Sequence, residues 1–151
     1  MIYPSTINSF NILLADDDKD DCLLFEDALE ELPLAAQLKC VYNGEQLMQL
    51  LNRQGEQLPD MLFLDLNMPR KNGIECLAEI KHNPHLQHLP VIIYSTSSQQ
   101  GIINLLYKNG AQLYICKPSS FSELKDLIRN AISLTREAAF TQLPREKFVL
   151  L

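Results

Sequence analysis

Four short apolar runs restrict the folds open to this chain more than any other feature. They occupy residues 12–15, 61–64, 91–94 and 113–116. Each has the length of a strand and is almost continuously apolar, whereas a strand with one face in water alternates apolar and polar residues. The runs therefore predict strands that are covered on both faces, as in a parallel sheet. A further strand, with a less regular pattern, is expected over residues 37–41.

Segments with helical spacing of apolar residues separate these runs. The clearest carries its apolar residues at i, i+3, i+4, i+7 and i+8, namely Leu124, Leu127, Ile128, Ala131 and Ile132. It follows Ser120-x-x-Glu123, a capping-box pattern. Other helices are expected around residues 25–32, 47–51, 74–78 and 102–106, the third of them capped by Asn72. Strand and helix thus alternate five times, which predicts an α/β fold with a doubly wound parallel sheet and helices on both faces.

The length of 151 residues suits one domain. We expect an N-terminal arm over 1–9, the domain over 10–136 and a C-terminal tail over 137–151. The tail is broken at Pro144 and carries apolar residues, which are Phe140, Leu143, Phe148, Val149, Leu150 and Leu151. So apolar an end is unusual in water, and we expect it to pack on the domain or on a dimer partner.

Composition excludes several classes of function. Nineteen acidic residues against thirteen basic ones give a net charge of −6, which argues against direct DNA binding, because phosphates are neutralised by clustered Lys and Arg. No apolar run approaches the roughly 18 residues of a membrane span, and the N-terminus lacks a basic signal-peptide region. The four cysteines are widely spaced, which favours buried thiols over disulfides or a zinc site. We therefore expect a soluble protein.

Polar residues follow the predicted strands directly. In an open parallel sheet, ligands bind outside the carboxyl ends of the strands. The residues at these ends are Asp16, Asp17 and Asp18 after the first strand, Asp65 after the third, Ser95 and Thr96 after the fourth, and Lys117 after the fifth. Carboxylates, a hydroxyl and an ammonium are therefore expected at one edge of the sheet.

Such a set fits phosphoryl transfer. Asp16, Asp17 and Asp65 would repel one another unless a cation neutralised them, and ligands that are all oxygen favour Mg²⁺ over zinc. The aspartates after the first strand could instead cap a helix, and Lys117 could serve only as their salt-bridge partner. A nucleophile, a divalent cation, and cationic or hydroxyl clamps are nevertheless what phosphoryl transfer requires.

The sequence closely resembles the receiver domain of two-component response regulators. The matching segments are residues 12–18, 65–69, 72–73, 90–95 and 114–118, which occur in the order and at the spacing of that family. The resemblance covers about residues 10–135. It implies a flavodoxin-like, five-stranded parallel sheet with strand order 2-1-3-4-5.

The resemblance also implies a role for each site residue. Asp65 would accept the phosphoryl group and, with Asp17 and the backbone carbonyl of Asn67, bind Mg²⁺; Asp16 would bind it through water. Lys117 would contact the phosphoryl group. Ser95 corresponds to the switch hydroxyl, with Thr96 as the alternative. Tyr114 corresponds to the switch aromatic, and Asp18 is left as a candidate helix N-cap.

Residues 67–73 and 81–84 are similar to a subgroup of stand-alone regulators that pair with cyanobacterial phytochrome kinases. This implies a cytoplasmic protein that takes a phosphoryl group from a sensor histidine kinase or a phosphotransfer protein. It would be no enzyme beyond self-phosphorylation and slow self-dephosphorylation. Residues 137–151 are too few for an effector domain, so we expect signalling by contact with a downstream protein. The face made by the fourth helix, fifth strand and fifth helix is a candidate homodimer surface.

Three alternatives remain open from the sequence. A Mg²⁺-dependent phosphohydrolase of the haloacid dehalogenase class would use Asp65 as a turnover nucleophile, but it usually has a second Asp where this chain has Asn67. A receiver-like scaffold that is never phosphorylated would not need Asp17, Asp65 and Lys117 together. A nucleotide-binding flavodoxin-like protein would need a loop after the first strand that does not repel phosphate.

Overall fold

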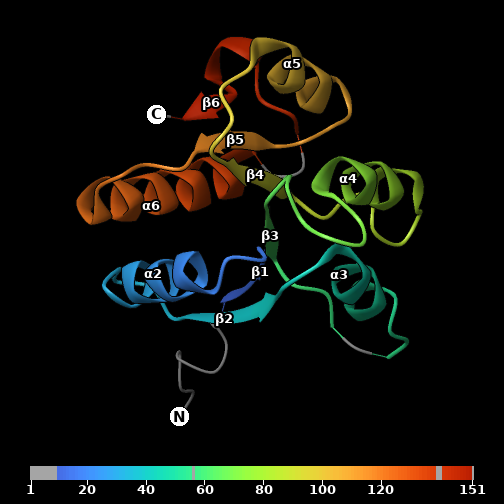
Figure 1. The fold of residues 1–151 in the computed structure, drawn as a ribbon, viewed down its shortest axis with the longest axis horizontal. Helices are drawn as coiled ribbons and strands as arrows, with labels where there is room; N and C mark the ends of the chain where they lie inside the picture. The colour runs from blue at the N-terminus through green and yellow to red at the C-terminus, as the bar shows by residue number, and fades with distance from the viewer. Residues whose placement is uncertain (1–9, 56, 139–140, 151) are drawn as a thin grey trace.

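The computed structural model describes residues 10–55, 57–138 and 141–150, and these form one parallel sheet between two layers of helices (Figure 1). The strands are β1 (Phe10–Ala15), β2 (Ala36–Val41), β3 (Met61–Leu64), β4 (Val91–Ser95), β5 (Leu113–Cys116) and β6 (Val149–Leu150). The helices are α2 (Lys19–Glu30), α3 (Gly44–Leu51), α4 (Gly73–His82), α5 (Gln100–Lys108) and α6 (Phe121–Ala138). Strand order is β2-β1-β3-β4-β5-β6, so the predicted α/β fold and the order 2-1-3-4-5 are confirmed.

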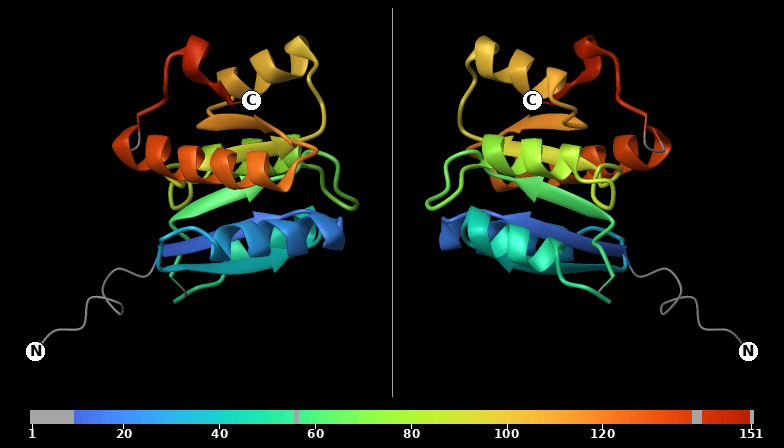
Figure 2. Two further views of the ribbon diagram at one scale, coloured as in Figure 1. Left: turned by 90° about the vertical axis from the view of Figure 1, so that its left-hand side faces the viewer. Right: turned by 90° about the vertical axis from the view of Figure 1, so that its right-hand side faces the viewer.

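The helices cover both faces of the sheet, as the continuously apolar strands predicted. Helices α2 and α6 lie on one face, and α3, α4 and α5 lie on the other (Figures 1 and 2). Within β1, Ile12 and Leu14 pack with Phe25 of α2, whereas Leu13 and Ala15 belong to the apolar cluster of the opposite face. Because successive side chains of a strand point to opposite faces, this division requires apolar residues at every position.

Side-chain caps mark the start of several helices at the carboxyl edge of the sheet, whereas α5 begins without one. Asn72 and Glu75 form a reciprocal capping box at the start of α4. The carboxylate of Asp18 accepts hydrogen bonds from the first turn of α2, so its suggested role as an N-cap is confirmed. At α6, the Ser120 hydroxyl accepts a hydrogen bond from the Glu123 backbone N–H at 3.2 Å.

A sixth strand extends the sheet beyond the five that were predicted. The chain turns after Pro144 into a 3₁₀ helix, η1 (Arg145–Lys147), and then places β6 parallel to β5. Phe148 is fully buried, and its carbonyl accepts a hydrogen bond from the Tyr114 N–H at 2.9 Å. The expectation that the apolar tail packs on the domain is therefore confirmed for 141–150. Phe140, Leu151 and the arm over 1–9 lie outside the described residues.

The described part of the chain also bears on the cysteines and on membrane insertion. All four cysteines are free thiols; Cys22 and Cys76 are buried, whereas Cys40 and Cys116 are half-buried. Over residues 10–55, 57–138 and 141–150, every helix is too short or too polar to cross a bilayer.

Candidate functional site

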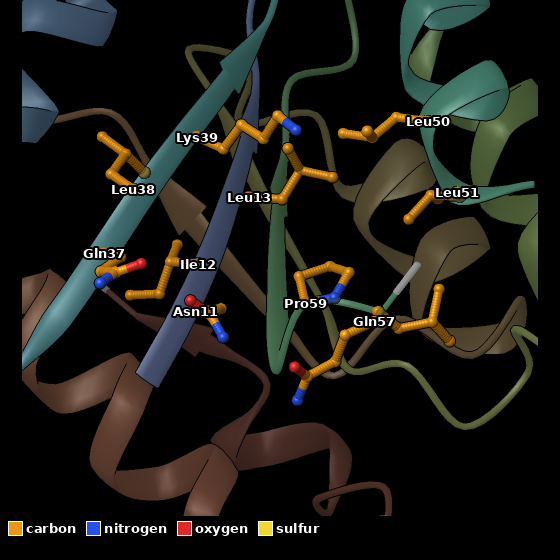
Figure 3. Close-up of a pocket in the computed structure, with 11 residues that line it drawn as sticks. Asn11, Ile12, Leu13, Gln37, Leu38, Lys39, Leu50, Leu51, Gln57 and Pro59 are labelled. Atoms are coloured by element: carbon orange, nitrogen blue, oxygen red, sulfur yellow. The ribbon is translucent and has the colours of Figure 1, made fainter. Parts of the chain in front are cut away.

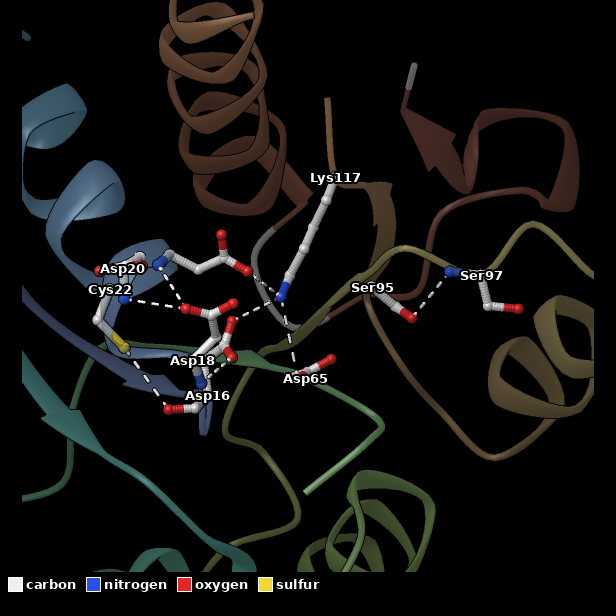
Figure 4. Close-up of polar contacts among 9 residues, drawn as sticks. Asp16, Asp18, Asp20, Cys22, Asp65, Ser95, Ser97 and Lys117 are labelled. Atoms are coloured by element: carbon white, nitrogen blue, oxygen red, sulfur yellow. Dashed lines mark hydrogen bonds and ion pairs between the residues drawn. The ribbon is translucent and has the colours of Figure 1, made fainter. Parts of the chain in front are cut away.

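Three carboxylates meet where β1 and β3 end. Ligand oxygens of Asp16, Asp17 and Asp65 all lie within 4.8 Å of one another. Parallel pairing of β1 with β3, which sets Ala15 beside Leu64, makes the residues that follow these strands neighbours. Asp16 is fully buried and Asp65 is 6% exposed, while Asp17 faces solvent. The structure thus brings together acidic residues that the strand ends predicted, and Figure 4 shows Asp16 and Asp65 of this cluster.

Lys117 enters the same site from the end of β5. Its backbone N–H donates to the Ser95 carbonyl at 2.8 Å, and its side chain points toward Asp16 and Asp65 (Figure 4). The ammonium lies 2.7 Å from Asp16 Oδ2 and 4.0 Å from Asp65 Oδ2. A third carboxylate, that of Asp21, accepts a hydrogen bond from it at 2.8 Å. Sequence reasoning missed Asp21, which lies in the first turn of α2.

Burial and the neighbouring charges shift the pKa values of the site residues in opposite directions. Burial raises the pKa of Asp65 to about 7, with a contribution from Asp16, although Lys117 acts to lower it. Burial also raises the pKa of Asp16 above its usual value, against its hydrogen bond from Lys117. For Lys117 burial acts to lower the pKa, but the hydrogen bonds to Asp16 and Asp21 outweigh it and the pKa lies above its usual value. The ammonium therefore stays charged, while the carboxylates resist ionising together.

This donor set fits a hard divalent cation. Asp16, Asp17 and Asp65 offer only oxygen ligands, which suits Mg²⁺ or Mn²⁺ better than zinc. A bound cation would also offset the burial, and the smaller repulsion from Asp16, that raise the pKa of Asp65. Asn67 lies in the loop that follows β3, and a contribution from its carbonyl stays a prediction.

The candidate switch residues meet at one backbone segment. The side chain of Ser95 is fully buried at the end of β4, whereas Thr96 is exposed, which favours Ser95 over Thr96. Ser95 Oγ accepts a hydrogen bond from the Ser97 N–H at 3.2 Å. Tyr114 is fully buried in β5, and its hydroxyl donates to the Ser97 carbonyl at 2.8 Å. Ser97, which sequence reasoning did not identify, therefore connects the hydroxyl to the aromatic ring.

A separate cavity of about 410 Å³ lies away from these residues, between β1, β2 and α3 (Figure 3). Leu13, Lys39, Leu50 and Pro59 are among its lining residues. Of the described residues that line it, none carries a carboxylate, and none belongs to the acidic cluster. The cavity therefore takes no part in the site at the strand ends.

Comparison with known proteins identifies the family. Residues 12–129 match the model of the response regulator receiver domain. The chain belongs to this family. The receiver domain is 32% identical over 130 residues to response regulator Rcp1 of Synechocystis sp., covering 83% of this chain and 88% of Rcp1. It is also 32% identical over 119 residues to a probable methanogenesis regulatory protein, FilR2, of Methanothrix harundinacea, covering 77% of each chain.

Solved structures give the same assignment. The receiver domain superposes on the phosphorylated cyanobacterial phytochrome response regulator RcpA with a TM-score of 0.76 and 31% identity, covering 90% of this chain and 97% of RcpA. The Mn²⁺-bound form of Rcp1 also gives a TM-score of 0.76 at 31% identity, covering 89% of this chain and 99% of Rcp1. The resemblance to phytochrome-associated regulators is thus found in both sequence and structure.

The raised pKa of Asp65 predicts how stability depends on pH. Without a divalent cation, the folded receiver domain binds a proton at Asp65 up to about pH 7, whereas the unfolded chain releases it near 3.8. Protonation of Asp65 therefore stabilises the folded state relative to the unfolded chain. This contribution is fully present below pH 3.8 and is lost as pH rises through about 7. Asp65→Asn cannot ionise, so at pH 8 its free energy of unfolding should exceed that of the wild type by about 2–4 kcal/mol.

Urea unfolding in EDTA between pH 4 and pH 8 measures this difference. We expect the two proteins to converge toward pH 4, and Mg²⁺ at pH 8 to reduce the advantage of Asp65→Asn. Curves that stay parallel across the whole range would show that Asp65 ionises in the folded protein as readily as in the unfolded chain.

Proposed function

We propose that this receiver domain accepts a phosphoryl group on Asp65 from a phosphohistidine of a sensor histidine kinase or a phosphotransfer protein. One observation carries the proposal: Asp65 shares a small site with two further carboxylates and with the ammonium of Lys117. A nucleophilic carboxylate, oxygen ligands for a cation and a fixed positive charge are the parts of a phosphoryl-transfer site.

In the proposed reaction, an oxygen of ionised Asp65 forms a bond to phosphorus as the bond from phosphorus to the imidazole nitrogen breaks. The imidazole keeps the electron pair of that bond and leaves as the free histidine of the donor. Lys117 favours the ionised form of Asp65 and offsets negative charge on the phosphoryl oxygens. A Mg²⁺ held by Asp16, Asp17 and Asp65 would supply further charge neutralisation.

Two relatives support this assignment by what is known of them. RcpA has been crystallised as a phosphorylated protein, and Rcp1 has been crystallised in a Mn²⁺-bound form. Mn²⁺ prefers the same oxygen ligands as Mg²⁺. For the present receiver domain, the equivalent phosphoryl acceptance and the use of Mg²⁺ are our proposal.

The output would pass through Ser95 and Tyr114 to a downstream protein. If Ser95 Oγ turns to a phosphoryl oxygen, it gives up the hydrogen bond from the Ser97 N–H. The Tyr114 hydroxyl donates a hydrogen bond to the Ser97 carbonyl, so a movement of the backbone at Ser97 would also move the Tyr114 side chain. The altered face would include α5, β5 and α6, which is also the proposed homodimer face. Residues 141–150 cover part of β5 there, so a partner would contact this segment as well.

We further propose that the protein works in the cytoplasm, without DNA contact and without enzymatic turnover beyond loss of its own phosphoryl group. The net charge of −6 supports the exclusion of DNA. Asn67, two residues after Asp65, is where haloacid dehalogenase-class phosphohydrolases usually carry a second Asp. This supports an aspartyl phosphate that persists rather than one that turns over rapidly.

Intact-protein mass measurement with acetyl phosphate tests the proposal. With Mg²⁺ the wild type should gain the mass of one phosphoryl group, and in EDTA it should gain none, because the carboxylates then lack the cation that neutralises them. Steady phosphate release at many turnovers per minute would favour the phosphohydrolase instead. No mass gain from acetyl phosphate or from a phosphorylated histidine kinase would favour the unphosphorylated scaffold.

A further inference from the structure

The ammonium of Lys117 is held by two carboxylates, neither of which is the proposed phosphoryl acceptor. It donates to Asp16 at 2.7 Å and to Asp21 at 2.8 Å. Asp65 Oδ2 lies 4.0 Å away, beyond hydrogen-bond distance. An ammonium has three N–H donors, and these two carboxylates engage two of them. The centroid of the Tyr94 ring lies 4.9 Å from the same ammonium, so among the described residues the third donor faces no oxygen acceptor within hydrogen-bond distance. The Lys117 side chain is only 10% exposed, which leaves it few other positions.

The backbone at the start of α2 fixes Asp21 in this place. Asp18 caps the helix by accepting hydrogen bonds from the N–H groups of Asp20 at 2.9 Å and Asp21 at 3.3 Å. The N–H of Asp18 in turn donates to Asp16 Oδ1 at 3.0 Å. A short series of hydrogen bonds therefore links the acidic cluster to the turn that carries Asp21.

Asp21 and Asp16 both bind Lys117, but only Asp16 also belongs to the carboxylate cluster that fits a cation. Asp16 belongs to the carboxylate cluster that fits a cation, so its charge is shared between that cluster and Lys117. Asp21 is outside the cluster as the described residues define it, and its side chain is 30% exposed. It can therefore hold Lys117 without giving up an oxygen that the cluster needs.

The distance of 4.0 Å has a consequence for the reaction. If the ammonium contacted Asp65 directly, it would pair with the attacking oxygen and occupy the space that the phosphoryl group must enter. A hydrogen bond to oxygen spans about 2.9 Å. From its observed place, Lys117 can reach a phosphoryl oxygen that extends from Asp65, while it leaves the carboxylate free to attack.

We propose that Asp21 is a positioning residue, which holds the Lys117 ammonium against Asp16 and away from Asp65 so that it serves the incoming phosphoryl group. The inference rests on the proposed function, because it assigns the open donor of Lys117 to a phosphoryl oxygen. Asp21 itself touches neither the phosphoryl group nor the cation.

Three variants test the inference. Asp21→Asn removes one anionic partner of Lys117, and Asp20→Asn removes the same charge one residue earlier, from a carboxylate that is not bonded to Lys117. Crystal structures without a phosphoryl donor should show the Lys117 ammonium within hydrogen-bond distance of Asp65 in Asp21→Asn, and still near 4.0 Å from it in Asp20→Asn.

The rate of phosphorylation gives a second measurement. At saturating acetyl phosphate, Asp21→Asn should be phosphorylated about tenfold more slowly than the wild type, the effect of one charged hydrogen bond. Asp20→Asn should stay within about twofold of the wild type, and Asp21→Glu should recover part of the rate.

The outcomes separate this inference from the proposed function. If Lys117 keeps its place in Asp21→Asn, or if Asp21→Asn and Asp20→Asn are phosphorylated at equal rates, Asp21 does not position it. If the wild type accepts no phosphoryl group, the proposed function is wrong, and the distance in the crystals still decides whether Asp21 holds Lys117. Melting temperatures of all the variants show whether a slow rate reflects lost fold, and Asp21→Glu should melt as the wild type does.

Discussion

Replacing Gly73 with alanine will lower the free energy of unfolding by about 3 kcal/mol and abolish phosphoryl acceptance. A Cβ at this position would lie 2.3 Å from the Asp65 carbonyl oxygen and 2.8 Å from the Leu66 Cα. These are backbone atoms, and the Gly73 N–H also donates to the Leu66 carbonyl at 2.9 Å. Neither the start of α4 nor the backbone after β3 can therefore shift without breaking this contact. The start of α4 would have to move away from β3, taking the loop after Asp65 with it.

Gly101→Ala is the matched control. It makes the same chemical change within α5, where an added Cβ has no described atom within 4 Å apart from the adjoining residues and the nearby backbone of its own helix. Alanine favours a helix over glycine by roughly 0.5–1 kcal/mol, so this variant should be slightly more stable and fully active. Urea unfolding and phosphorylation by acetyl phosphate measure both effects. Equal stability of the two variants would mean that the close approach of Gly73 to β3 is unimportant.

Replacing Phe148 with alanine will lower the free energy of unfolding by about 3–5 kcal/mol, the usual cost of removing a buried phenylalanine side chain. The ring is fully buried and packs edge-on against Tyr107, with centroids 5.0 Å apart. It also contacts Tyr114, whose N–H bonds to the Phe148 carbonyl. The same residue therefore fills the core and fixes β6 against β5.

If residues 141–150 detach while the rest of the domain stays folded, the loss cannot exceed the stability that this segment contributes. Amide hydrogen exchange separates the two outcomes: detachment speeds exchange of the Tyr114 N–H in particular, since its acceptor is the Phe148 carbonyl. Phe121→Ala serves as the control, since Phe121 is 37% exposed at the start of α6. The prediction fails if Phe148→Ala has the wild-type free energy of unfolding and its Tyr114 N–H exchanges as slowly as in the wild type. That result would show that the segment adds no stability.

The sequence predicted the fold well because its signals were local and repeated. The predicted runs at 61–64 and 113–116 match β3 and β5 residue for residue. β6 could not be foreseen, since two residues carry no period and their place depends on an exposed edge of β5 that only the folded sheet creates. The apolar end of the chain indicated burial but not where Phe148 would lie.

The site was predictable in part for the same reason. Strand ends located Asp16, Asp65 and Lys117, because a parallel sheet brings its carboxyl ends together. Spacing along the chain does not say which carboxylates a lysine reaches. Asp21 therefore looked like an ordinary acidic residue of a first helical turn, although it lies 2.8 Å from Lys117.

Mapping the phosphorylated residue tests the central claim most directly. Wild type, Asp65→Asn and Asp18→Asn are treated with acetyl phosphate and Mg²⁺, and their masses are compared before and after digestion. Asp18→Asn is the control, because asparagine also caps helices well and the cluster of Asp16, Asp17 and Asp65 stays intact. We predict one phosphoryl group on the peptide that contains Asp65 in the wild type and in Asp18→Asn, and none in Asp65→Asn. A phosphoryl group retained by Asp65→Asn would contradict the account.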